Sequence, residues 1–337
     1  MLPKAHLHLH LEGSMRPGTL ADLAVAAGAP LPDVRGYRSF AEFGARYADT
    51  VALVRTEADL RRVVREVIED AAVDGSVWAE PSVNPLAYPD RIGPPPYVLD
   101  VLLDESRTTA GRLGIGCGLM VTAQRHLAPE SALDLARLAA TRAGQGVVAF
   151  GLAADEARHA PEPFSRAFAV ARDAGLISAP HAGELVGEAS ILGALDALGA
   201  DRIGHGVRAV EAPELLARLA AEGTVLDVCP TSNVRLGVVP ALDVHPLPRL
   251  LEAGVRCTIG ADDPLLFGPG LLDEYVTARD VLGLDETRLA DIARCSVEAS
   301  GAPEPIVGAA LRDIAAWLST DAAHLPLPRV KAEDSPT

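Results

Sequence analysis

Eight short apolar runs, most of them followed by a stretch with helical periodicity, constrain the fold of this 337-residue chain. They are the N-terminal stretch from Pro3 to Gly13 and the segments 76–80, 114–123, 146–153, 176–180, 202–204, 224–229 and 255–260. Strands that alternate with helices form a parallel sheet, and eight such units are the number that closes into a barrel. The sequence therefore predicts an α/β fold, a (β/α)8 TIM barrel, rather than an open doubly wound sheet.

Further helical patterns lie between the first two predicted strands and after the last one. Apolar residues recur at three-and-four spacing in segments 19–27, 39–53 and 57–73, and again in 271–282, 286–297 and 305–318. No internal repeat or flexible linker marks a domain boundary. We therefore expect one barrel domain over residues 1–325 with extra helices in these two places, followed by a flexible C-terminal tail over 326–337.

Composition excludes several kinds of partner. The net charge of −16 argues against a nucleic-acid polymer, since binding to a phosphate backbone needs a cationic surface. No apolar stretch is long enough to span a bilayer, so we expect no membrane partner. The four cysteines form no C-x-x-C pair, and no leader precedes the first histidines, so we expect a cytoplasmic protein. The sequence leaves a homo-oligomer open.

The N-terminal run carries polar residues at every second position. His6, His8, His10 and Glu12 alternate with leucines, so an extended strand would present all four on one face. Imidazole is the commonest metal ligand in proteins, and two histidines one residue apart on a strand can reach one divalent ion. This stretch therefore suggests part of a metal site, for which the rest of the chain must supply the other ligands.

Polar residues also follow several later strands, where active sites of parallel barrels lie. They are His181, His205, Asp262 and Asp263, together with Asp155 and Glu156. One of the two aspartates could join His8, His10 and His181 around one Zn²⁺ ion per chain and leave a position open for water. The other would be free to contact substrate.

Two further residues have chemistry that suits this site. Glu184 follows His181 after a glycine that lets the backbone bend, and its carboxylate suits general acid/base work. His205 stands between two glycines and could orient a metal-bound water. The segment 229–233 is interpreted chiefly as a turn beside the site.

Five motifs, in this order, resemble those of the adenosine deaminase family in the amidohydrolase superfamily. They are HLHLEG at 8–13, HAGE at 181–184, RIGHG at 202–206, CPTSN at 229–233 and ADDP at 261–264. The resemblance extends from residue 3 to about residue 300. It implies a metal, usually Zn²⁺, held by His8, His10, His181 and Asp262.

The resemblance also implies catalytic roles for three residues. Glu184 would donate a proton to N1 of a purine, His205 would hold and activate the attacking water, and Asp263 would form a hydrogen bond with N7. The reaction implied is hydrolytic deamination of a 6-aminopurine nucleoside, first of all adenosine to inosine and ammonia. Bound zinc lowers the pKa of water towards about 7.

Substrate contacts are implied for Asp263, Gly183, Ala154 and Glu12, and two of these depart from the usual pattern. Glu12 stands where members specific for nucleosides typically carry an aspartate that contacts the ribose 5′ hydroxyl. Ala154 replaces a glycine whose N–H approaches purine N3. His6 falls at a position without a ligand role and is expected beside the site or at the surface.

Other functions remain open from the sequence. Glu12 resembles members that act on free adenine, and a 5′-extended adenosine such as aminodeoxyfutalosine is a further candidate. A metal-dependent hydrolase of phosphoesters or lactones is less favoured, because the fourth strand ends at Ala154 without the lysine that bridges two metals in such sites. A binding protein without activity is disfavoured because every matched ligand and Glu184 are retained.

Overall fold

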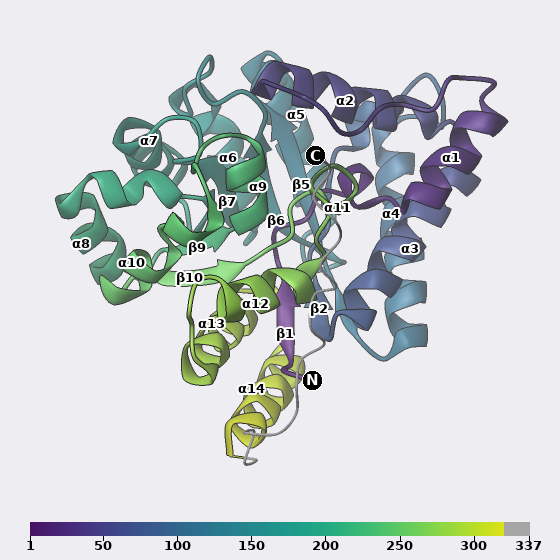
Figure 1. The fold of residues 1–337 in the computed structure, drawn as a ribbon. Helices are drawn as coiled ribbons and strands as arrows, with labels where there is room; N and C mark the ends of the chain where they lie inside the picture. Colours follow the sequence, from purple (N-terminus) through teal and green to yellow (C-terminus); the bar gives the residue numbers. More distant parts are fainter. Residues whose placement is uncertain (320–337) are drawn as a thin grey trace.

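The structure, a computed structural model, describes residues 1–319 (Figure 1). The strands are β1 (Lys4–His6), β2 (Ser76–Ala79), β3 (Ser82–Val83), β4 (Gly116–Cys117), β5 (Leu119–Gln124), β6 (Val147–Ala153), β7 (Ile177–Ala182), β8 (Arg202–His205), β9 (Val225–Val228) and β10 (Arg256–Ile259). The helices are α1 (Pro17–Ala26), α2 (Phe40–Leu53), α3 (Glu57–Val73), α4 (Pro95–Leu113), α5 (Pro129–Ala140), α6 (Ser165–Asp173), α7 (Glu188–Leu198), α8 (Pro213–Glu222), α9 (Pro230–Arg235), α10 (Leu247–Glu252), α11 (Pro264–Phe267), α12 (Leu271–Asp280), α13 (Glu286–Glu298) and α14 (Glu304–Ser319). The tail predicted over 326–337 lies outside the described residues.

The strands pair in parallel to form a closed ring. One sheet has the order β10-β9-β8-β7-β6-β5-β3 and the other the order β1-β2-β4. Two predicted strands are each split, at Glu80–Pro81 between β2 and β3 and at Gly118 between β4 and β5. The ten strands therefore occupy eight positions around the barrel, each of which we call a stave. Proline has no N–H to donate to a ladder, which accounts for the first break.

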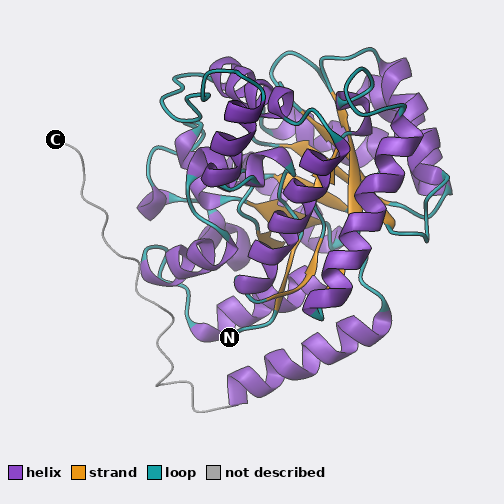
Figure 2. Ribbon diagram, turned by 90° about the vertical axis from the view of Figure 1, so that its right-hand side faces the viewer, coloured by secondary structure: helices purple, strands orange, loops and turns teal. Residues whose placement is uncertain are grey.

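The ring closes where the chain after β1 pairs with the chain after β10. The N–H of His10 donates to the carbonyl of Asp262 at 2.9 Å, and the N–H of Asp262 donates to the carbonyl of His8 at 3.1 Å. These bonds join the first stave to the last, and the predicted (β/α)8 barrel is confirmed. The strands are enclosed by helices (Figure 2).

The helices form where capping and periodicity predict them. Thr56 and Asp59 make a reciprocal capping box at the start of α3, and the Ser39 side chain caps α2. The extra helices α1, α2 and α3 precede β2 as predicted, and α2 lies across the upper end of the barrel in Figure 1. No helix within residues 1–319 is long and apolar enough to cross a membrane.

Two short helices were not predicted. Most of segment 229–233, expected as a turn, lies in the six-residue helix α9, which begins at Pro230. The second short helix, α11, begins directly after Asp263. Each begins with a proline at its first position, Pro230 and Pro264, where a missing N–H costs nothing. Both helices are too short to show a hydrophobic period, which is why periodicity could not reveal them.

Candidate active site

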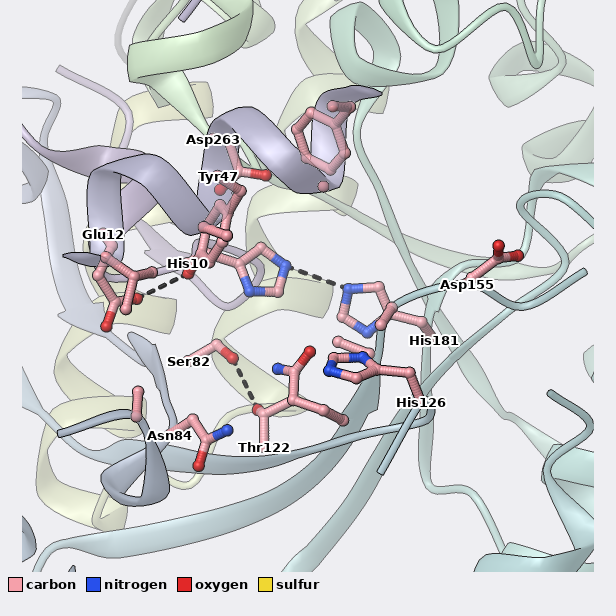
Figure 3. Close-up of a pocket in the computed structure, with 18 of the residues that line it drawn as sticks. His10, Glu12, Tyr47, Ser82, Asn84, Thr122, His126, Asp155, His181 and Asp263 are labelled. Carbon is pink, nitrogen blue, oxygen red and sulfur yellow. Dashed lines mark hydrogen bonds between the residues drawn. The ribbon is translucent and has the colours of Figure 1, made fainter. Parts of the chain in front are cut away.

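The four predicted metal ligands converge inside the carboxyl end of the barrel. The Oδ1 atom of Asp262 lies 3.3 Å from Nε2 of His8 and 3.2 Å from Nε2 of His10. The Nε2 atoms of His10 and His181 are 3.2 Å apart (Figure 3). Residues from the first, fifth and last staves therefore place three imidazole nitrogens and one carboxylate oxygen around one point.

The donor set fits a divalent metal ion. Nε2 of His8 is buried and has no hydrogen-bond partner among the described residues. One ligand atom from each of His8, His181, His205 and Asp262 can be chosen so that all lie within 4.8 Å of one another. Three imidazoles with one carboxylate are typical of a catalytic zinc site. His205 belongs to this cluster as well, so which four residues bind the ion stays a prediction.

Asp262 is held as a carboxylate by its neighbours. Burial alone would raise its pKa, but the charge of His8 and the close contact with His10 outweigh it and lower the pKa well below its ordinary value. The Ser232 hydroxyl donates to Oδ2 of Asp262 at 2.6 Å. His6, predicted to lie beside the site or at the surface, is buried, and its Nε2 accepts the N–H of Ala261 at 3.1 Å.

Three residues at strand ends adopt a left-handed backbone without being glycine. Ala154 follows β6 with φ 79°, His205 ends β8 with φ 64°, and Asp262 follows β10 with φ 59°. Such conformations cost energy for residues with a Cβ and cluster at functional sites. All three were singled out from the sequence, and Ala154 stands where the family pattern has glycine, the residue that this conformation favours.

Glu184 lies on the loop that follows β7, and the buried carboxylate of Glu156 holds this loop. Oε1 of Glu156 accepts the N–H of Gly183 at 2.6 Å, and Oε2 accepts three more, from Glu184 at 3.0 Å, Leu185 at 2.6 Å and Val186 at 3.1 Å. This geometry fixes the backbone on which the predicted acid stands. The sequence placed Glu156 at a strand end without giving it a role.

The environment of Glu184 favours its protonated form. Burial, followed by the negative charges of Asp262, Glu156 and Asp263, raises the pKa of Glu184 well above its ordinary value. Its Oε1 lies 3.6 Å from Nε2 of His205. A carboxyl group whose protonated form is favoured by its surroundings suits the role of a general acid.

Gly183 and Asp263 take different positions around the pocket. Gly183 has φ +71°, its N–H is used by Glu156, and a Cβ there would collide with Ile191. Its predicted contact with a purine stays a prediction. Oδ1 of Asp263 is buried without a hydrogen-bond partner among the described residues, and it packs where a Cβ on Gly13 would stand.

Glu12 is bound by two tyrosines that the sequence did not reveal. The Tyr47 hydroxyl, from α2, donates to Oε2 of Glu12 at 2.6 Å (Figure 3). The Tyr88 hydroxyl donates to Oε1. Glu12 is 3% exposed, and burial raises its pKa. Both carboxylate oxygens therefore already have hydrogen-bond partners within the protein.

The cluster opens into a pocket of about 590 Å³. Its metal end is formed by His10, His181, His205, Glu184, Asp262 and Asp263, and its outer wall by α2 residues that include Phe40, Phe43, Tyr47 and Val51. Ala154 lines the pocket as predicted. In Figure 3, Asp155 lies on the opposite side of the pocket from Glu12.

Sequence reasoning missed several residues that support the site. The buried guanidinium of Arg125, which follows β5, donates to the carbonyl of His181. His245 contacts Asn233, which in turn contacts His205. Asn233 belongs to the motif at 229–233, which was interpreted only as a turn, whereas Arg125 and His245 belong to no motif with recognisable spacing and reach the site through the fold.

Comparison with known proteins identifies the family. A family model described as adenosine deaminase matches residues 3–317. The chain belongs to the adenosine deaminase family. It is 47% identical to a putative adenosine/adenine deaminase of Streptomyces coelicolor, over 94% of this chain and 97% of that protein.

Two solved structures share this fold. The adenine deaminase of Arthrobacter aurescens superposes with a TM-score of 0.89 at 31% identity, covering 95% of this chain and 100% of that one. An amidohydrolase from Burkholderia ambifaria with bound Zn superposes with a TM-score of 0.84 at 27% identity, covering 96% and 90%. The family resemblance and barrel fold predicted from the sequence are thus confirmed, and the chain is a hydrolytic deaminase of the amidohydrolase type.

Proposed function

We propose that this member of the adenosine deaminase family is a zinc-dependent hydrolytic deaminase of a 6-aminopurine, and that free adenine is its preferred substrate. The observation that carries the substrate choice is the pair of hydrogen bonds from Tyr47 and Tyr88 to Glu12. The close contacts among His8, His10, His181 and Asp262 support zinc as the metal.

The residues of the pocket divide the reaction between them. A zinc ion on the histidines and Asp262 would supply a water of lowered pKa, about 7. Glu184 holds a proton and gives it to N1 of the purine, which makes C6 electrophilic. Asp263 positions the ring at N7. Water oxygen adds at C6 and the bond to the amino group breaks. One proton of the water leaves with the amino group as ammonia and the other returns to Glu184, so adenine and water become hypoxanthine and ammonia.

Glu12 argues against adenosine, the substrate that the family resemblance put first. A ribose 5′ hydroxyl would have to approach a buried carboxylate whose two oxygens each already accept a tyrosine hydroxyl, either as a second bond to the same oxygen or by displacing a tyrosine. Breaking a buried hydrogen bond without replacement costs about 1–3 kcal/mol. A free purine base makes no such demand, and the Arthrobacter aurescens relative is described as an adenine deaminase.

The volume of the pocket supports a second candidate, a 5′-extended adenosine such as aminodeoxyfutalosine. About 590 Å³ falls within the range of pockets that hold drug-sized ligands, about 300–1,000 Å³, and exceeds what a bare purine fills. Apolar residues of α2, among them Phe40 and Val51, line the part away from the metal cluster. A substituent in place of the 5′ hydroxyl could occupy this space without needing Glu12.

The deciding experiment is ammonia release by zinc-loaded protein from adenine, adenosine and a 5′-extended adenosine, compared by kcat/KM. We expect adenine to be preferred to adenosine by at least about tenfold, which corresponds to ~1.4 kcal/mol. Preference for adenosine would mean that Glu12 reaches the 5′ hydroxyl, and preference for the extended compound would select the second candidate. No ammonia from any of them would refute the aminopurine proposal and favour another hydrolase reaction.

Glu184→Gln provides the test of mechanism. The amide keeps the shape of the side chain but has no proton to give to N1, so turnover should fall by about 10²–10⁴-fold while metal content is unchanged. Substantial remaining activity would remove Glu184 from the acid role.

A further inference from the structure

A chain of hydrogen bonds leads from the backbone of α10 to the ring of His205. It passes through His245 and Asn233, both buried, which the proposed reaction does not use. The four partners come from α10, the segment before it, α9 and the end of β8. Because each group in this series of hydrogen bonds either donates or accepts, the series determines which ring nitrogens of His245 and His205 carry a proton.

The first link has a fixed direction. The backbone N–H of Leu247 donates to Nδ1 of His245 at 3.1 Å. A ring nitrogen that accepts a hydrogen bond carries no proton, so the proton of His245 must be on Nε2. Burial lowers the pKa of His245 to about 4, which agrees with a neutral ring.

The second and third links follow from the first. Nε2 of His245 lies 3.2 Å from Oδ1 of Asn233 and donates to it. The Nδ2 atom of Asn233 lies 3.2 Å from Nδ1 of His205 and can only donate. The reverse orientation of the Asn233 amide would set its N–H group against the N–H of His245, so it is excluded.

We propose that His245 and Asn233 are positioning residues that fix His205 as the tautomer with its proton on Nε2. His205 is then a hydrogen-bond donor to the reaction centre and not a base that removes a proton from water. This differs from the water-activating role that the family resemblance implied for His205. The consequence for catalysis rests on the proposed deamination, but the tautomer itself does not.

The position of Nε2 agrees with a donor. It lies 3.6 Å from Oε1 of Glu184 and 3.8 Å from Oδ2 of Asp262, so its N–H faces a space bounded by two carboxyl groups. Oδ2 of Asp262 already accepts the Ser232 hydroxyl. Oxygen added at the purine C6 would develop negative charge in this region, and an N–H donor stabilises such charge.

The test is nuclear magnetic resonance of zinc-loaded protein labelled with ¹⁵N in its histidines. Correlations between ring carbon-bound protons and nitrogens distinguish the two tautomers and the charged ring, and the His205→Gln variant identifies the signal of His205. We expect His205 with a protonated Nε2 and a bare Nδ1 near neutral pH. A proton on Nδ1 would overturn the proposal without affecting the proposed substrate.

Two variants test whether the series of hydrogen bonds through His245 and Asn233, here called the relay, controls the tautomer of His205. Asn233→Asp replaces the donor to Nδ1 by an acceptor, so Nδ1 should become protonated and kcat should fall by about 10²-fold with KM changed less than about threefold. Gln145→Glu, at an exposed position, adds the same charge and should change neither value. An unchanged His205 signal in the Asp variant would refute the relay.

His245 offers a matched pair that avoids any new charge. Gln at position 245 can still donate an N–H to Oδ1 of Asn233, whereas Leu cannot. We expect His245→Gln to keep the His205 spectrum and most of the activity, and His245→Leu to give a mixture of tautomers with reduced kcat. Equal spectra from the two variants would contradict a role for His245.

Discussion

The carboxylate of Glu156 accepts the backbone N–H of Glu184 at 3.0 Å and holds three neighbouring N–H groups in the same way. One side chain at the end of β6 therefore fixes the loop that follows β7. Its negative charge also contributes to the raised pKa of Glu184. The position and the protonation of the proposed acid thus depend on the same residue.

Replacement of Glu156 by Gln should lower activity without removing the metal. A glutamine has one acceptor oxygen, and its NH₂ group would face N–H donors of the loop. Loss of hydrogen bonds to a charged group costs roughly 1.5–3 kcal/mol each, so we expect kcat to fall about 10- to 100-fold. Glu130→Gln, at an exposed site on α5, is the control. An unchanged kcat in Glu156→Gln would show that the loop holds its own conformation.

Asp262→Ala should release the metal. The carboxylate contacts His8 and His10, and its removal leaves only nitrogen donors in the cluster. Loss of a residue that merely supports a ligand typically weakens metal binding about 10- to 100-fold. Loss of the direct ligand Asp262 should weaken zinc binding by more than this. Metal content after dialysis measures this directly, with Asp313→Ala on the exposed side of α14 as control. Full zinc occupancy in Asp262→Ala would make this ligand assignment wrong.

Tyr47→Phe should shift the substrate preference towards adenosine. The change frees Oε2 of Glu12 while keeping the aromatic ring against the pocket. One hydrogen bond is worth about 0.5–1.5 kcal/mol, so the ratio of kcat/KM for adenosine to that for adenine should rise about 2- to 10-fold. The matched control is Tyr97→Phe, which removes a hydroxyl at the start of α4 that is bonded to Glu57 of α3. A constant ratio would show that Glu12 does not govern the choice.

Stability should fall as pH rises because of Glu274. This buried residue on α12 accepts the N–H of Thr231, and burial raises its pKa from 4.5 to about 8. Between these values the folded protein keeps a proton that the unfolded chain releases, so the free energy of unfolding decreases with increasing pH. Glu274→Gln removes this contribution. The Tm of Glu274→Gln minus that of the unchanged protein should therefore increase as pH rises from 4.5 to about 8. Parallel curves of Tm against pH would show that Glu274 does not keep its proton in the folded protein.

The sequence predicted the barrel and the residues at the ends of its strands because both are written in local patterns. The helix over 57–73 was predicted with its observed bounds, since its cap and its period agree. The left-handed backbone at Ala154 and His205 belongs to positions that the motifs had marked. Periodicity and motif spacing therefore predict most of the fold and the cluster of candidate metal ligands.

What the sequence could not reveal depends on contacts between distant segments. Tyr47 and Tyr88 reach Glu12 from 35 and 76 residues away, and neither belongs to a motif. His245 acts on His205 only through Asn233. Such partners are determined by how elements pack in three dimensions, and a single sequence records no trace of that packing.

The backbone pairing between the first and the last stave joins parts of the chain that are synthesised at different times. Asp262, whose backbone pairs with both His8 and His10, comes more than 250 residues after them in the chain. A ribosome-bound chain that lacks this last stave has the first histidines but not the carboxylate beside them. Completion of the ring therefore has to wait for the last strand, and an ion bound there would join the two ends of the barrel.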